Sequence, residues 1–313
     1  MDRSGWTARY SAGWVAGVLL TGLVLATAPS RAGAQGGEGD TVAPVLWQPS
    51  MNVFRRFAVD RAKMVEFYGT VLGLRRLPSF DLGGGGEMTR FLVGTSEIKL
   101  TTVVPNRQYA GGLIQAATGL RVITFFFPDE AALAARFRQY GYPEPRFTSA
   151  GGGRRVAHVT DPDGQWVELV VAPGAPPDTF DRIEVGLTVS NLERSRAFYR
   201  DFVGLEELPP VDDPILAVKK YPYRHGTTTV NLFTFGAGLP ANTGSAGIQY
   251  VVHTVERVDA LARSRGVKID TPLGNSLGTL RTIWLSDPDG ITNYFAETAQ
   301  SRAARPGAPP PPR

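Results

Sequence analysis

The feature that most constrains the fold of this chain is an internal repeat. The segment DPDG occurs at residues 161–164 and again at 287–290, and an apolar stretch follows it both times. Earlier in each half, an FY pair is followed by GL, at residues 67–74 and 198–205. A repeat of this kind indicates duplicated units that bury a shared core. Proline suits the second position of a tight turn and glycine its end, so we interpret both DPDG segments as structural turns.

Each half of the repeat contains two smaller units that are similar to each other. Ile183, Val185 and Leu187 alternate with polar or small residues, which is the pattern of a half-buried strand. A helix and further strands follow, and a single βαβββ unit of this type cannot bury both faces of its sheet. The sequence therefore predicts an α+β fold, in which four βαβββ units pair into two domains with open curved sheets. We expect the first unit to pair with the second and the third with the fourth.

The ends of the chain and the junction between its halves differ from the repeat in composition, because they are rich in glycine and proline. From these differences, and from the leader pattern of the first 34 residues, we expect a signal peptide at 1–34, a flexible lead-in at 35–50, a first domain at 51–172, a linker at 173–180, a second domain at 181–298 and a disordered tail at 299–313.

Residues 1–34 have the pattern of a secretory signal. Arg3 and Arg9 precede an uncharged apolar run, and an A-x-A pattern ends at Ala34. We therefore expect cleavage after Ala34, a secreted or periplasmic protein, and no stable membrane insertion after cleavage. The alternative is an uncleaved anchor, although the apolar part is short for a membrane span of about 20 residues.

Composition excludes several classes of function. The chain has no cysteine, which rules out disulfides, thiolate nucleophiles and thiolate metal sites. It has 33 basic and 29 acidic residues and a net charge of +4, part of which lies in the leader. No basic segment interleaved with aromatic residues is present, so we expect no nucleic-acid partner.

The doubled FY…GL openings, the paired DPDG strands and the duplication itself resemble the vicinal oxygen chelate superfamily. This group includes glyoxalase I, extradiol dioxygenases and bleomycin-resistance proteins. The resemblance covers residues 51–298 and implies paired βαβββ units that curl around an open cleft for a small molecule. It also implies a divalent metal in that cleft, held by His, Gln or Glu on the first strand of a unit and by Glu on the last.

In the second domain, the resemblance and strand alternation place Glu184, Asn231, Gln249 and Tyr294 at these positions, with His253 on the same face. One carboxylate without an imidazole makes a weak site for zinc or iron. Glu184 and Gln249 could hold Mg, Mn or Fe weakly, or the cleft binds no metal. His253 could act as a general base near neutral pH, or it is a structural histidine.

In the first domain the equivalent positions are Phe54, Lys99, Arg121 and Glu168, a set that does not suit a cation. One interpretation is an internal salt bridge from Arg121 or Lys99 to Glu168. The other is an anion pocket, in which the two cations bind a carboxylate or phosphate. We interpret His158, which stands where the second half has Trp284, as a packing aromatic residue.

Two functions are consistent with these positions. The first is an exported lyase, isomerase or dioxygenase relative that acts on a small oxygenated molecule in the cleft of the second domain. Glu184 would be its metal ligand or base, and Gln249, His253 and Tyr294 would orient the substrate. The second is a metal-free binding protein that sequesters a ligand, as drug-resistance members of the superfamily do.

Overall fold

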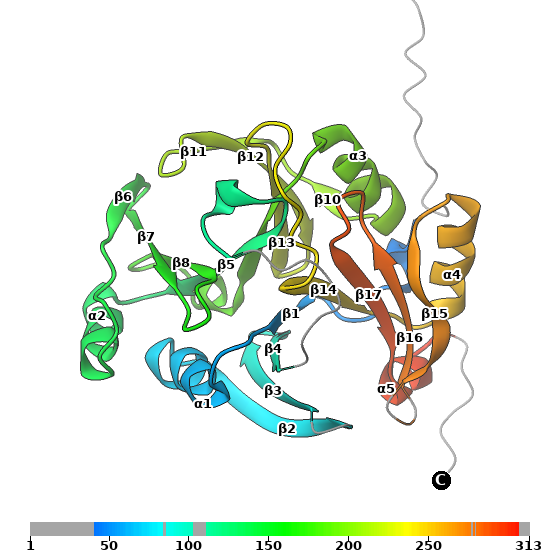
Figure 1. The fold of residues 1–313 in the computed structure, drawn as a ribbon, viewed down its shortest axis with the longest axis horizontal. Helices are drawn as coiled ribbons and strands as arrows, with labels where there is room; N and C mark the ends of the chain where they lie inside the picture. Colours follow the sequence, from blue (N-terminus) through cyan, green and yellow to red (C-terminus); the bar gives the residue numbers. More distant parts are fainter. Residues whose placement is uncertain (1–40, 84–85, 103–110, 277, 279, 307–313) are drawn as a thin grey trace, which may run out of the picture. The chain divides into compact units, whose positions relative to one another are not determined.

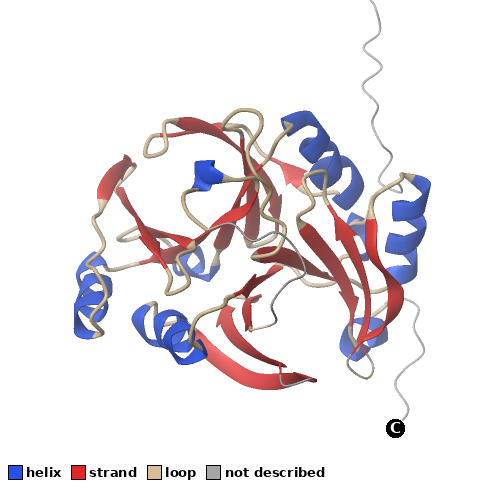
Figure 2. Cartoon of the chain, in the orientation of Figure 1, coloured by secondary structure: helices blue, strands red, loops and turns tan. Residues whose placement is uncertain are grey.

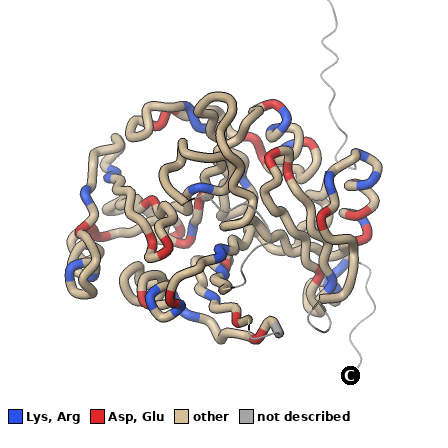
Figure 3. The backbone as a smooth tube through the Cα atoms, in the orientation of Figure 1, with Lys and Arg blue, Asp and Glu red and all other residues tan. Residues whose placement is uncertain are grey.

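The computed structural model describes residues 41–83, 86–102, 111–276, 278 and 280–306. The predicted signal peptide, the first part of the lead-in and the last residues of the tail lie outside these ranges. Among the described residues, no helix has both the length and the apolar character needed to cross a membrane. Lys and Arg are interspersed with Asp and Glu along the described chain (Figure 3).

The fold consists of two mixed sheets with few helices (Figures 1 and 2). In sheet order, the first sheet contains β15 (Ile269–Ser276), β16 (Leu280–Ser286), β17 (Thr292–Glu297), β14 (Ala246–Val251), β1 (Asn52–Arg56), β4 (Ser96–Thr101), β3 (Gly86–Val93) and β2 (Arg75–Gly83). The second contains β10 (Glu206–Glu207), β12 (Val218–His225), β13 (Thr228–Phe233), β9 (Ile183–Thr188), β5 (Gly119–Phe127), β8 (Trp166–Val171), β7 (Arg154–Thr160) and β6 (Thr148–Gly151), and β11 (Val211–Asp213) pairs with β12.

Helices cover one face of each sheet and bury the apolar side of its strands. They are α1 (Arg61–Val65), α2 (Glu130–Gln139), α3 (Leu192–Arg196), α4 (Val255–Ser264) and α5 (Ala299–Ala303), and π-helical turns extend α1 and α3. Val185 and Leu187 on β9 pack in the same core as Phe198 and Tyr199. Because side chains alternate along a strand, the polar residues between them face the opposite side of the sheet.

The four βαβββ units and the α+β class are confirmed, but the predicted pairing of the units is wrong. The first unit shares a sheet with the fourth, because β1 pairs antiparallel with β14 and sets Asn52 opposite Gln249. The second unit shares a sheet with the third, because β5 pairs antiparallel with β9 and sets Thr124 opposite Glu184. Each sheet therefore takes one unit from each half of the chain.

The two repeated motifs contact each other in both halves. The Tyr68 hydroxyl donates to Asp161 Oδ2 at 2.9 Å, and the Tyr199 hydroxyl donates to Asp287 Oδ2 at 3.0 Å. In the first copy, the fully buried Arg55 also donates to Asp161 from Nη1 at 2.9 Å. The FY and DPDG motifs thus tie the first unit to the second and the third to the fourth, across the two sheets.

Two expectations about irregular segments are wrong for the residues that the structure describes. Residues 41–50 pack on the fold, where Val42 N donates to Phe202 O and Trp47 N to Val251 O, each at 2.9 Å. The start of the tail forms α5, which a capping box between Thr298 and Ser301 begins. Burial of Val42 and this cap order segments that composition alone marked as flexible.

Candidate functional site

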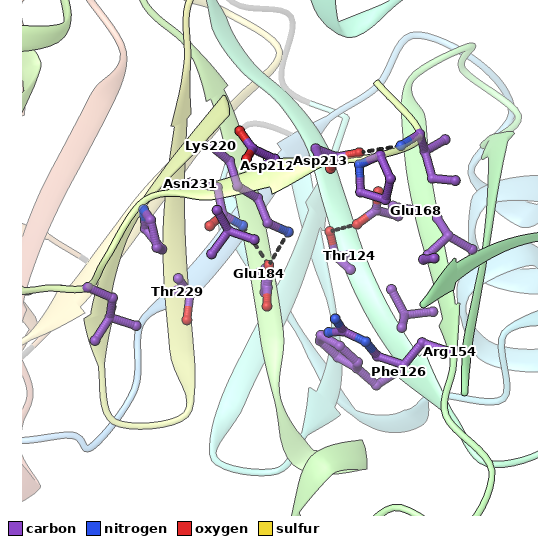
Figure 4. Close-up of a pocket in the computed structure, with 18 residues that line it drawn as sticks. Thr124, Phe126, Arg154, Glu168, Glu184, Asp212, Asp213, Lys220, Thr229 and Asn231 are labelled. Atoms are coloured by element: carbon purple, nitrogen blue, oxygen red, sulfur yellow. Dashed lines mark hydrogen bonds and ion pairs between the residues drawn. The ribbon is translucent and has the colours of Figure 1, made fainter. Parts of the chain in front are cut away.

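The second sheet carries a cavity of about 380 Å³ on the face away from its helices (Figure 4). Side chains at one level of three neighbouring strands, β8, β5 and β9, form its polar floor, and His158 on β7 stands next to this floor without lining the cavity. His158 lies opposite Glu168, Glu168 lies beside Thr124, and Thr124 lies opposite Glu184. Asn231 on β13 and Lys220 on β12 continue this floor toward the other edge of the sheet.

Both carboxylate oxygens of Glu168 accept hydrogen bonds. Oε1 accepts from Thr124 Oγ1 at 2.9 Å, and Oε2 lies 2.9 Å from His158 Nε2. Burial alone would raise the pKa of Glu168, but the hydrogen bond and charge of His158, together with Lys220 and Thr124, outweigh burial and hold this pKa below its usual value. Glu168 is therefore a fixed, ionised carboxylate.

Neither cation predicted to pair with Glu168 does so. Lys99 belongs to the first sheet, and the Arg121 guanidinium donates to the carbonyls of residues 111–113 at 2.7–3.1 Å. His158, which we interpreted as a packing residue, stacks on Trp166 with ring centroids 4.7 Å apart, but it is also the partner of Glu168.

Glu184 has a different environment from Glu168. Its Oε2 accepts from Asn231 Nδ2 at 2.6 Å and lies 3.9 Å from Lys220 Nζ, whereas its Oε1 has no hydrogen-bond partner among the described residues (Figure 4). The side chain is 25% exposed, so this free oxygen is accessible from the cavity. Asn231 Oδ1 is buried and also lacks a partner there. The cleft thus offers a free carboxylate oxygen, an ammonium group and an unfilled acceptor.

Aromatic residues pack in the corresponding part of the first sheet. Tyr294 stacks on Trp284 with centroids 4.5 Å apart, and Phe54 lies 5.7 Å from Tyr294. Gly247 makes room for the Phe54 ring, because a Cβ at this glycine would stand 2.3 Å from Phe54 Cζ. Tyr294 is therefore part of a small apolar cluster and does not share a cleft with Glu184, contrary to the prediction.

The predicted metal pair of Glu184 and Gln249 is also separated. Gln249 lies in the first sheet, where its Oε1 accepts from Lys99 Nζ and from Asn52 Nδ2, the latter at 3.1 Å. Burial lowers the pKa of Lys99, and Glu97 offsets this effect only in part. The polar partner of Gln249 across the sheet is thus Asn52, which the sequence analysis missed in favour of Phe54.

Two further residues that we predicted to face a cleft do not do so, because the strand is irregular or has ended at their positions. The pairing of β5 with β9 shifts register between Leu120 and Val122, so the polar cleft residue of β5 is Thr124 and not Arg121. The sequence did contain a signal for Thr124 as a cleft residue, because Thr124 is the one polar residue in the apolar run 122–127. His253 lies beyond the end of β14, where its Nδ1 is 2.9 Å from Ser301 O, so it is not a base in either cleft.

The residues of the second cleft do not fit the metal ion that the family resemblance implies. Both oxygens of Glu168 already have donors, and the ammonium of Lys220 lies beside Glu184. Across the ranges that the structure describes, no group of three or more His, Asp or Glu side chains is placed to hold a metal. Catalytic zinc sites use about three such ligands, and Thr124 and Asn231 supply only neutral oxygens.

Comparisons with known enzymes agree with this fold. A lactoylglutathione lyase of Arabidopsis thaliana is 29% identical over 164 residues, which are 52% of this chain and 56% of that protein. The match thus spans just over half the length of that relative. A lactoylglutathione lyase of Pseudomonas aeruginosa is 29% identical over 137 residues, which are 36% of this chain and 77% of that protein.

Structure and family comparisons cover more of the chain. The solved structure of glyoxalase I from Zea mays has a TM-score of 0.60 at 21% identity and covers 80% of this chain and 92% of its own, a likeness that shows the fold alone. The sequence model of the family matches residues 50–169 and 179–295, which is well over half of the chain. The chain therefore belongs to the glyoxalase/bleomycin resistance protein/dioxygenase superfamily, as its repeated motifs predict.

Proposed function

We propose that this protein binds a small oxygenated organic molecule in the cleft of the second sheet and catalyses proton transfer on it. The observation that carries the proposal is the pair of carboxylates, Glu168 and Glu184, in different surroundings on either side of Thr124. Proton-transfer enzymes commonly use two titratable groups whose environments differ, so that one accepts a proton and the other supplies one. The cavity of about 380 Å³ lies within the range of roughly 300–1,000 Å³ that small-molecule sites occupy.

The contacts of each side chain suggest its role. Glu184 Oε1 is the free carboxylate oxygen and would take the proton, while Asn231 fixes the other oxygen of that carboxylate. Lys220 would donate to a substrate oxygen as negative charge develops on it. Glu168 is ionised in the free protein and held by Thr124 and His158, so it would pass to the substrate a proton that reaches it during turnover.

The test is hydrogen–deuterium exchange followed by proton NMR. The full chain in D₂O would be incubated with S-lactoylglutathione, because relatives are lactoylglutathione lyases, and with a panel of small hydroxy ketones and keto acids. Loss of a general base typically costs 10²–10⁴-fold, so we expect Glu184→Gln to slow exchange by roughly that factor. Glu206→Gln is the matched control, since Glu206 pairs with Arg224 on the surface. Exchange by Glu184→Gln at the wild-type rate would contradict the proposal.

A second candidate function is binding without chemistry, as in the drug-resistance members of the superfamily. It is favoured by the apolar wall of the cavity, formed by Phe126, Val156, Val170, Leu208, Pro214 and Ile215. Calorimetry with the same compounds separates the two functions. Binding by both wild type and Glu184→Gln, with no exchange by either, would support sequestration and not catalysis.

Export is a further part of the proposal and concerns residues that the structure does not describe. It rests on Arg3 and Arg9 before an apolar run, and on the A-x-A pattern that ends at Ala34. The full chain would be expressed in a bacterial host and its N-terminus determined by mass spectrometry. We expect the mature chain to begin at Gln35 outside the cytoplasm, and an intact cytoplasmic chain would refute export.

A further inference from the structure

We propose that His158 is a positioning residue that carries protons between Glu168 and solvent, through a second cavity beside the cleft. This inference rests on the proposed proton-transfer function. It goes beyond it by assigning a role to a histidine that does not line the cleft itself and by naming the route along which Glu168 exchanges its proton.

The hydrogen-bonded chain across the sheet supports this role. His158 Nε2 lies 2.9 Å from Glu168 Oε2, and Thr124 holds the other oxygen of the same carboxylate. The side chains of His158 and Glu168 are only 15% and 12% exposed, so the contact is sheltered from bulk water. β7 pairs with β8 without a shift in register. His158 and Glu168 therefore stand opposite each other on neighbouring strands, and this pairing holds the two side chains together.

The two members of this pair face different cavities. Glu168 lines the cleft of about 380 Å³. His158 lines a separate cavity of about 430 Å³, together with Trp166, Thr160 and the loop after α2. Among the described residues His158 Nδ1 has no hydrogen-bond partner, so it is free to meet water in this second cavity. A proton on the imidazole can therefore reach Glu168 without passing through the substrate cleft.

The other half of the repeat shows that packing alone does not require this pair. The strand pairing of β16 with β17 sets Trp284 opposite Tyr294, in the positions that His158 and Glu168 occupy in the second sheet. Those rings stack with an interplanar angle of 11°. A tryptophan thus satisfies the packing of this position, and the titratable pair occurs in the sheet that carries the polar cleft.

The proton balance of the step is simple. Water gives a proton to His158 Nδ1 while the Nε2 proton passes to Glu168, whose neutral carboxyl group then protonates the substrate. The imidazole is left with its proton on Nδ1 and regains the Nε2 tautomer by exchange with water. The substrate gains one proton and water becomes hydroxide, which takes up the proton that Glu184 removed from the substrate, so no other reactant is needed.

The first measurement needs no substrate. The chain has three histidines, so ¹⁵N-histidine labelling of the full chain gives a simple spectrum that His225→Gln and His253→Gln assign. We expect His158 to carry its proton on Nε2 and this signal to shift in Glu168→Gln. A His158 protonated on Nδ1, with no response to Glu168→Gln, would overturn the relay.

The second measurement uses the deuterium-exchange assay with those same probes. We expect His158→Trp, which copies the other half, and His158→Ala to slow exchange at least 10-fold, and added imidazole to restore most of the rate in His158→Ala only. His253→Ala is the control and should match wild type. Wild-type rates in His158→Trp would overturn the relay and leave the proposed function standing. No exchange by wild type on any probe would instead refute the proposed function, and the relay with it.

Discussion

The two DPDG turns look alike in sequence, but we predict that neutralising their first aspartates has opposite consequences for stability. Asp161 forms a fully buried ion pair with Arg55. Asp161→Asn would leave the Arg55 charge buried without its partner, and breaking a buried pair in this way typically costs about 3–5 kcal/mol. We therefore expect Asp161→Asn to lower the free energy of unfolding by that amount.

Asp287 has no ion pair among the described residues. Burial raises its pKa to about 7, although the backbone N–H groups of Ile291 and Asp289 and the Tyr199 hydroxyl act in the other direction. Because this pKa in the folded state is higher than the ordinary 3.8, the folded protein binds more protons between about pH 4 and 7, and stability falls as pH rises through that range. The difference corresponds to at most about 4 kcal/mol, at 1.36 kcal/mol per pKa unit.

Asp287→Asn should remove this pH dependence. Its side-chain oxygen can still accept from Asp289 N and Ile291 N, which lie 3.0 and 2.8 Å from Asp287 Oδ1. Asp287→Asn should gain stability over wild type between pH 5 and pH 8, by about 3 kcal/mol, because about two of the three pKa units lie in that pH range.

The assay is urea unfolding of wild type and both variants at pH 5 and pH 8, followed by fluorescence and circular dichroism. Coincidence of the two signals checks that the transition is cooperative. The reasoning is refuted if Asp161→Asn is as stable as wild type, or if Asp287→Asn retains the wild-type decline in stability between the two pH values.

Two further substitutions test the packed face of the first sheet and the cleft of the second. Gly247→Ala places a Cβ 2.3 Å from Phe54 Cζ, so thermal unfolding should show a loss of about 1–3 kcal/mol, and an unchanged melting temperature would contradict this packing. Lys220→Met should slow deuterium exchange about 10²–10³-fold if its ammonium stabilises developing charge, whereas Lys219→Met, which removes only a surface pair with Asp212, should leave the rate unchanged. Equal rates in the two lysine variants would count against the role of Lys220.

The repeated motifs predicted the units of this fold but not their partners. Tyr68 and Asp161 lie in the same family segment, yet they come from units in different sheets. The edge of a first strand can pair with either of two similar strands, and sequence similarity between units cannot distinguish them. The choice depends on three-dimensional contacts, such as the one between Asn52 and Gln249 across the centre of the first sheet.

The candidate site was predicted in part. Glu184, Asn231 and Glu168 were named as candidates, and the structure brings them to one cleft, although the sequence analysis assigned them to separate domains. The alternation of side chains along a strand correctly predicted the face of the sheet on which these three side chains lie. It failed for Arg121, where the strand shifts register, and for His253, which lies past the strand end, because the period of two holds only inside a regular strand.

The crossed pairing explains how the open faces of the two sheets can differ. Since each sheet is built from one unit of each half, substitutions on the cleft-side positions of the first and fourth units change the open face of the first sheet and leave that of the second unchanged. There Phe54, Trp284 and Tyr294 fill the centre, and each aromatic contact of this kind adds about 0.5–1.5 kcal/mol beyond its buried area. The second sheet keeps buried polar groups, including an Asn231 oxygen without a partner, and such groups lower stability unless a ligand satisfies them. One sheet has therefore become a packed support, and the other retains costly polar groups where a substrate would bind.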